Sequence, residues 1–271
     1  MDPYAWSWNA EAIVVLGLTA GYLVALRRYP APAWRIGCFL GAMALLLAVS
    51  VTPIHTLGMH YLLTMHLLQN VALAEWAPLL VVLGLPPALA AAITRPTALR
   101  VLTHPAVALP LWLANYMLWH LPWLYDAALE NPSTLLHLEH ALYVLTGTAM
   151  WWCVFQDEPH RLGSGARAGY VFAAFVLGSP IGLVMALVPN AIYDFYVETH
   201  HRVWGLDPLE DQQLAGALMA FEQAAVFFAV LAYWFFRFLA EEERREDLEP
   251  PSGSGTLITG ARSSVDRAAD F

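Results

Sequence analysis

The sequence predicts an all-α polytopic membrane protein, a bundle of seven transmembrane helices followed by a short polar tail. Hydrophobic residues make up 59% of the chain and charged residues 13%, and the mean hydropathy is +0.52. Long apolar stretches recur, each close to the roughly 20 residues that cross about 30 Å of hydrocarbon. These observations exclude an ordinary soluble domain, and we expect lipid rather than nucleic acid around the chain.

The apolar stretches follow one another with short connections. We expect spans at about residues 9–26, 35–51, 60–83, 105–121, 133–154, 168–189 and 212–238. Proline and arginine interrupt residues 84–104, so this stretch is expected to be a cytoplasmic connection. Residues 1–240 would form one transmembrane domain. Residues 241–271 are charged and then rich in proline, glycine and serine, which predicts a disordered cytoplasmic tail.

The arginines predict the orientation of the bundle. The chain contains 13 basic residues, all of them arginine. In the seven-span arrangement, twelve fall on one side of the membrane and only Arg202 on the other. Positive charge accumulates in cytoplasmic loops. We therefore expect the N-terminus outside and the C-terminus in the cytoplasm.

The same arrangement gathers most histidines on the outer side. Only His104 and His160 of the ten fall on the inner side. The outer histidines are His55, His60, His66, His120, His137, His140, His200 and His201. Neutral imidazole is a common transition-metal ligand and titrates near neutral pH. The one-sided distribution therefore indicates metal or proton chemistry at the outer face, although a buried histidine often only forms structural hydrogen bonds.

Candidate metal ligands occur near the outer ends of three expected spans. On a continuous third helix, Met59, His66 and Asn70 would lie within about 40° of one another. On the fifth helix, His137 and His140 have the i, i+3 spacing of a shared face. Glu139 between them would orient a neighbouring ligand by hydrogen bonding.

The fourth span contributes Met117 and His120, also spaced i, i+3. A thioether combined with imidazole suits copper, especially Cu(I), better than magnesium or calcium. For Met117 alone, core packing is the simpler interpretation.

Two acids, Glu75 and Glu222, lie deeper in the expected membrane region. Asp211 and Glu222 share one face of the last helix, and Glu75 lies in the third. A charged side chain in the bilayer costs free energy, so such residues usually serve a function or are protonated. Glu222 would act in a proton or cation relay, or it would bridge helices by hydrogen bonds.

Three blocks of sequence resemble the CtaG-type cytochrome c oxidase assembly factors. The first contains His66-Leu-Leu-Gln-Asn70 and a following Ala-Pro-Leu-Leu-Val-Val-Leu-Gly-Leu-Pro segment. The second runs from Trp119-His120-Leu-Pro through His137-Leu-Glu-His140 to a Trp-Trp pair. The third, beginning at Asp211, is Asp-Gln-Gln-Leu-Ala-Gly. In order, these blocks cover about residues 55–235.

The resemblance implies a multi-pass protein of the bacterial inner membrane that helps to assemble a haem–copper oxidase. It implies no catalytic activity, and copper bound or delivered at the outer face. The expected partners are oxidase subunits and a periplasmic copper chaperone. The polar residues carried over are His66, His120, His137, Glu139, His140 and Asp211.

One position departs from the family pattern. Asn70 stands where the family usually has a second histidine. Asparagine is a poor Cu(I) ligand, so the site would use Met59, Met65 or His60 instead, or bind metal more weakly. Alternative functions are a copper or proton-coupled transporter, a membrane haem protein, and a scaffold for assembly that binds no metal.

Overall fold

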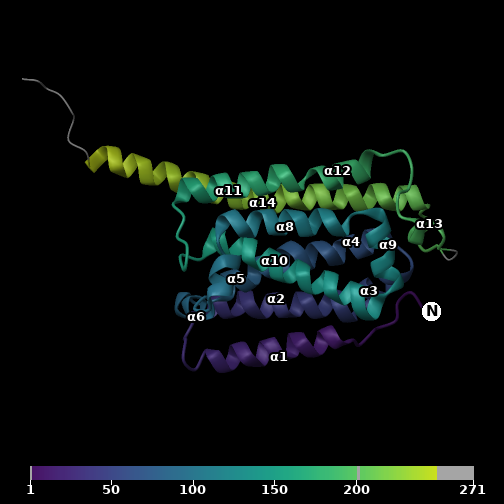
Figure 1. Cartoon of the computed structure of the whole chain (residues 1–271), viewed down its shortest axis with the longest axis horizontal. Coiled ribbons are helices and arrows are strands. Elements are labelled where there is room, and N and C mark those ends of the chain that lie inside the picture. Colours follow the sequence, from purple (N-terminus) through teal and green to yellow (C-terminus); the bar gives the residue numbers. More distant parts are fainter. Residues whose placement is uncertain (1, 200–201, 249–271) are drawn as a thin grey trace, which may run out of the picture.

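The computed structural model describes residues 2–199 and 202–248, and this part of the chain is all-α. Its longer helices lie side by side (Figure 1). They are α1 (Ala10–Ala25), α2 (Ala33–Val51), α4 (Leu63–Val71), α5 (Ala77–Gly84), α8 (Pro105–Trp119), α10 (His137–Phe155), α11 (Ser164–Gly178), α12 (Pro180–Leu187) and α14 (Pro208–Leu248). This confirms the all-α part of the predicted fold class.

Short helices cover the two ends of the bundle. At the end where the chain begins lie α3 (Pro53–His60), α9 (Pro122–Glu130) and α13 (Asp194–Val197), as Figure 1 shows. At the opposite end lies α6 (Pro87–Ile93), which α7 (Thr97–Leu102) follows in the predicted connection 84–104. Two π-helical turns, η1 (Ala72–Trp76) and η2 (Pro132–Leu136), precede α5 and α10.

Four helical stretches of the described part of the chain are long and apolar enough to cross a membrane. They are Ala33–Val51, Leu63–Gly84, Ser164–Leu187 and Pro208–Leu248, and α1 is a shorter apolar helix. The surface also exposes large apolar side chains such as Ile13, Leu187 and Phe221. Water-soluble proteins rarely expose apolar surface on this scale. The chain is therefore a multi-pass membrane protein.

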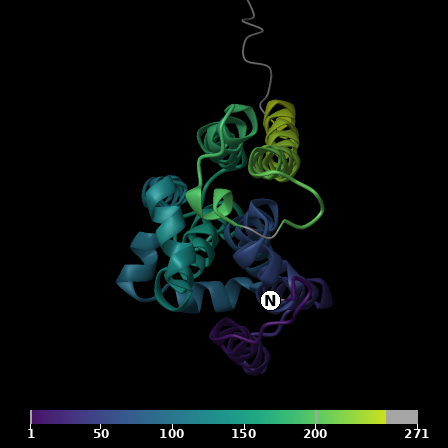
Figure 2. The same ribbon diagram turned by 90° about the vertical axis from the view of Figure 1, so that its right-hand side faces the viewer.

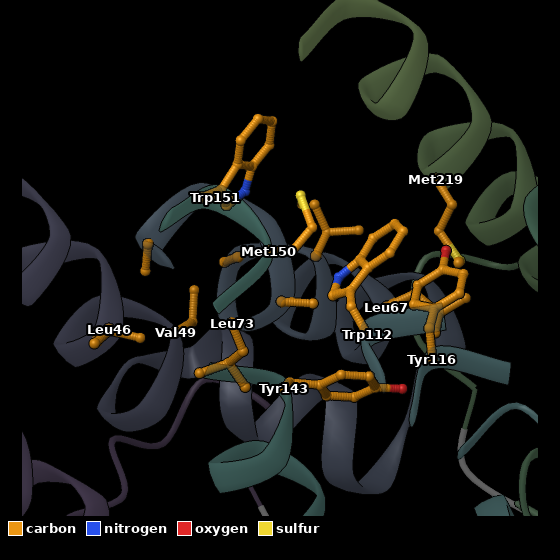
Figure 3. Packing of buried hydrophobic residues seen from close by; sticks show 14 of the residues in the cluster. Leu46, Val49, Leu67, Leu73, Trp112, Tyr116, Tyr143, Met150, Trp151 and Met219 are labelled. Atoms are coloured by element: carbon orange, nitrogen blue, oxygen red, sulfur yellow. The ribbon is translucent and has the colours of Figure 1, made fainter. Parts of the chain in front are cut away.

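In the bundle α10 packs against η1, α5 and α8, and α4 packs against η1 and α14. Viewed along the helices, α1 lies at one edge and α11, α12 and α14 at the other (Figure 2). Aromatic and long aliphatic side chains fill the space between these layers, among them Trp112, Met150 and Trp151 (Figure 3). At Gly147 the backbones meet so closely that a Cβ would lie 2.0 Å from the carbonyl oxygen of Ala74. Glycine is therefore required where α10 crosses η1.

The predicted third helix is not continuous. Helix α3 ends at His60, and α4 begins at Leu63 after an extended Leu62. Met59 therefore belongs to a different helix from His66 and Asn70, and the shared face predicted for the three residues is wrong. The physical reason is a cap from elsewhere in the chain, because the carboxylate of Asp211 accepts hydrogen bonds from the first backbone N–H groups of α4.

The last helix is longer than its apolar stretch. Helix α14 continues to Leu248, past residue 240, where the sequence predicts the transmembrane domain to end. Ion pairs at helical spacing join Arg237 to Glu241 and Arg245 to Glu242, and such pairs support a helix in water. The remainder of the predicted tail, residues 249–271, lies outside the described residues.

Candidate functional site

Three buried histidines come together near the end of the bundle where the chain begins. His66 comes from α4, His120 from the end of α8 and His140 from the second turn of α10. The ring centroids of His66 and His140 are 6.4 Å apart. The ring of Tyr125 lies 5.3 Å from that of His66 and 6.3 Å from that of His120. We refer to His66, His120 and His140 as the histidine cluster.

Hydrogen bonds determine which nitrogen carries the proton in two of these rings. Nδ1 of His120 lies 2.8 Å from the carbonyl oxygen of Tyr116, which only accepts, so this nitrogen donates. Nδ1 of His140 lies 2.6 Å from Oε1 of Glu11, which orients the ring in the same way. In the neutral rings Nε2 therefore carries the free lone pair, the arrangement that second-sphere partners impose on metal-binding histidines.

The free nitrogens are buried and have no hydrogen-bond partner among the residues that the structure describes. This holds for Nε2 of His120, Nε2 of His140 and both ring nitrogens of His66. Buried polar atoms are normally hydrogen-bonded, because an unpaired one loses the stabilisation that water gave it. A group of unpaired imidazole nitrogens on three neighbouring elements is therefore a candidate binding site for a cation or a polar ligand.

Asp211 and Gly58 hold α4 in place. Asp211 is fully buried, and its carboxylate accepts from the backbone N–H groups of Leu63 at 2.7 Å and Thr64 at 3.0 Å. A negative charge at this position also complements the positive end of the helix dipole. At Gly58 an added Cβ would lie 2.9 Å from the Cα of His66, so α3 packs directly on the backbone of the histidine.

Asn70 and Glu139 pair with each other beside the cluster. The Nδ2 group of Asn70 donates to Oε1 of Glu139 at 3.1 Å, joining α4 to α10. Both side chains are buried. The amide therefore satisfies one carboxylate oxygen of Glu139. In this chain, the residue that replaces the predicted second histidine serves as a hydrogen-bond donor.

A fourth histidine at this end of the bundle, His55 on α3, has the opposite tautomer. The Nε2 group of Gln69 is 3.3 Å from Nδ1 of His55 and donates to it, because an amide nitrogen has no acceptor lone pair. Burial, followed by the nearby His140, lowers the pKa of His55 to about 4, although Glu11 acts in the other direction. His55 is therefore neutral at physiological pH.

The other predicted ligands lie outside the cluster. Met117 is 45% exposed on α8, whereas His120 is buried, so the structure separates this predicted pair. Met59 is buried in the apolar core. His137 is half-buried at the start of α10, where its Nδ1 lies 2.5 Å from the carbonyl oxygen of Pro132. His200 and His201 lie outside the described residues.

Glu11 was not predicted as a site residue. Glu11 pairs with His140 and also accepts a hydrogen bond from the hydroxyl of Ser50 at 3.0 Å. An acid inside the first apolar stretch was the available signal, because such residues usually serve a function. Glu11, His137 and His140 also line the polar end of an apolar cavity of about 790 Å³ between α1, α2, α5 and α10.

Glu222 does not join the histidines. It lies on the buried face of α14 predicted to include Asp211, but the indole N–H of Trp76 donates to its Oε2 at 2.7 Å. Within the described residues, no group of three or more histidine, cysteine, aspartate or glutamate side chains is arranged to hold a metal ion. The donor set of the histidine cluster nevertheless fits a metal that accepts imidazole, provided that its side chains move closer together.

The fold and the buried polar end together define a multi-pass membrane protein with a candidate ligand site near one face of the membrane. The family model for the cytochrome c oxidase caa3 assembly factor (Caa3_CtaG) matches residues 20–241. The chain therefore belongs to the family of cytochrome c oxidase caa3 assembly factors, which confirms the resemblance. No curated protein and no solved structure matches the chain.

Proposed function

We propose that this protein assists the assembly of a haem–copper cytochrome c oxidase by holding copper as cargo in the histidine cluster. Cu(I) needs fewer ligands than most metal ions, and imidazole is one of the ligands that copper accepts. His66, His120 and His140 would bind the ion, and an oxidase subunit would receive it. The protein would carry copper without making or breaking covalent bonds in a substrate, so it would not be an enzyme.

The single observation that carries this proposal is the set of unpaired, buried imidazole nitrogens on three neighbouring elements. In His120 and His140 the protonated nitrogen is already engaged, which leaves the lone pair of the other free for a metal. Burial would protect a bound ion from exchange with water. Glu139 and Asp211 would act indirectly, Glu139 through Asn70 and Asp211 by capping the helix that carries His66.

The proposal includes a topology. Helices α1, α8 and α10 would cross the membrane together with the four longer stretches, giving seven spans. The arginine distribution supports an outer N-terminus and a cytoplasmic C-terminus. In a bacterial inner membrane the histidine cluster would then face the periplasm, where a copper chaperone would supply the ion.

The test is copper stoichiometry in detergent-purified protein, supplied with copper under reducing conditions. We expect about one Cu(I) per chain, with loss in His66→Ala, His120→Ala and His140→Ala. His60→Ala is the matched control, because His60 is exposed on α3 and should leave the stoichiometry unchanged. Circular dichroism and size-exclusion profiles would check folding.

Two results would contradict the proposal. Wild-type protein that binds no copper would leave a scaffold acting through protein contacts alone. Copper retained in all three cluster variants and lost in His137→Ala would place the site at the rim of the cavity instead. A Soret band in the purified protein would favour the haem alternative, and copper flux across reconstituted vesicles would favour the transporter alternative.

A further inference from the structure

Two acidic side chains meet inside the bundle, away from the histidine cluster. Glu75 comes from the π turn η1 and is fully buried, and Glu222 comes from α14 and is 6% exposed. Each lies in a stretch long and apolar enough to cross a membrane. Two reciprocal hydrogen bonds bring them together, because Glu75 accepts from Gln223, which follows Glu222, and Glu222 accepts from Trp76, which follows Glu75.

One oxygen of each carboxyl group has a neutral donor. Oε1 of Glu75 accepts from Nε2 of Gln223 at 2.9 Å, and Oε2 of Glu222 accepts from the indole of Trp76 at 2.7 Å. The same Gln223 amide lies 3.3 Å from the hydroxyl of Tyr116 on α8. These partners orient both carboxyl groups, but they bring no positive charge.

The other oxygens have no donor. Oε2 of Glu75 and Oε1 of Glu222 are buried without a partner, and so is Oε1 of Gln223. The titratable groups that act on the pair are its own two members, with Tyr116 facing them from α8. No cationic side chain among the described residues contributes. Two adjacent carboxylates in an apolar interior repel each other, so this arrangement lacks one positively charged or donating ligand.

A single proton supplies what the geometry lacks. Shared between the two carboxyl groups, it provides a donor to an unpartnered oxygen and removes one of the two negative charges. The π turn is part of the arrangement, because Glu75 and Trp76 both belong to η1 and contact α14 from there. Such turns within α-helices are frequent at functional sites.

We propose that Glu75 and Glu222 together bind one shared proton within the membrane at neutral pH. This proton site contacts none of the three clustered histidines and does not depend on copper binding. The shared proton would link Glu75 of η1 to Glu222 of α14. Loss of the proton would place two negative charges at the contact between these elements.

Infrared spectroscopy of the wild-type protein and its Glu75→Gln, Glu222→Gln and double variants tests the proposal. A protonated carboxylic acid gives a carbonyl stretch above the amide I band that shifts in D₂O. We expect such a band at neutral pH in the wild-type protein. Each single variant should lose it, because the glutamine amide replaces the shared proton as donor and the remaining acid becomes ionised.

Glu130→Gln, at an exposed position of α9, is the matched control and should leave the band unchanged. Glu139→Gln identifies any separate contribution to the carbonyl band from the carboxyl group of Glu139, which accepts a hydrogen bond from Asn70. A band that keeps half its intensity in each single variant would show two independent acids and overturn the shared proton. A wild-type spectrum without the band, or carboxylate bands that shift on adding sodium, would replace it with two ionised groups or a cation site.

Discussion

The cap that Asp211 places on α4 gives a sharp prediction about stability. In Asp211→Ala the backbone N–H groups of Leu63 and Thr64 lose their acceptor. Both residues are buried, so water does not readily replace the carboxylate. The helix that carries His66 would then begin with unpaired donors.

The expected loss follows from those two donors. Leaving a buried donor unsatisfied costs about 1–3 kcal/mol, so the pair corresponds to about 2–6 kcal/mol of unfolding free energy. The hydroxyl of Thr64, which also donates to the carboxylate at 2.7 Å, loses a further partner but is able to rotate. Asp211→Asn should fall between the wild-type protein and the alanine variant, because its amide keeps one acceptor oxygen and adds a competing donor.

Unfolding by titration with a denaturing detergent, followed by circular dichroism, measures these differences. Asp207→Ala is the matched control, because Asp207 caps the exposed start of α14 by accepting from Glu210 at 2.8 Å. The loss of an exposed cap costs about 1 kcal/mol. An Asp211→Ala protein no less stable than Asp207→Ala would refute the reasoning, since the buried carboxylate would then contribute nothing beyond an ordinary cap.

Three further predictions concern close packing and pH. Gly58→Ala should destabilise the protein by about 1–3 kcal/mol, because the new methyl group would meet the backbone of His66, whereas Gly17→Ala faces open space and should be neutral in the same unfolding assay. Gly147→Ala should be at least as damaging, because its Cβ would overlap the carbonyl oxygen of Ala74; equal stability of the three variants would contradict the close backbone contacts at Gly58 and Gly147. The pKa of His55 is about 4 in the folded protein and about 6.5 when unfolded, so the unfolded state binds more protons and stability falls as the pH drops from about 6.5 towards 4. His55→Gln should remove this part of the pH dependence, and an unchanged profile would show that His55 is not its source.

Much of the fold was predictable from hydropathy alone. The apolar stretches near 35–51, 168–189 and 212–238 correspond to helices that the structure contains, because backbone groups in an apolar environment must pair within the segment. The break after His60 was not predictable in the same way. The local sequence there continues a helical pattern. The carboxylate that caps the start of α4 after the break belongs to Asp211, far along the chain.

The candidate site was also predictable only in part. Residue type and position identified His66, His120 and His140 as candidates, and their gathering at one end follows from the order of the spans. Met117 was placed with His120 by spacing, but the helix ends at Trp119 and the two side chains differ in exposure. Glu11 was overlooked because its partner, His140, lies on a helix that no local pattern connects to α1.

The sequence by itself determined that this chain is an α-helical membrane protein of the caa3 assembly factor family. Hydropathy and the order of motifs are visible along the chain without any knowledge of its fold. Only the tertiary structure decided which polar side chains meet. The orientation of the His140 ring by Glu11, and the placement of Glu75 beside Glu222 by Gln223 and Trp76, depend on hydrogen bonds between distant segments. Such pairings are set by the packing of helices against one another, which no periodicity within a single helix encodes.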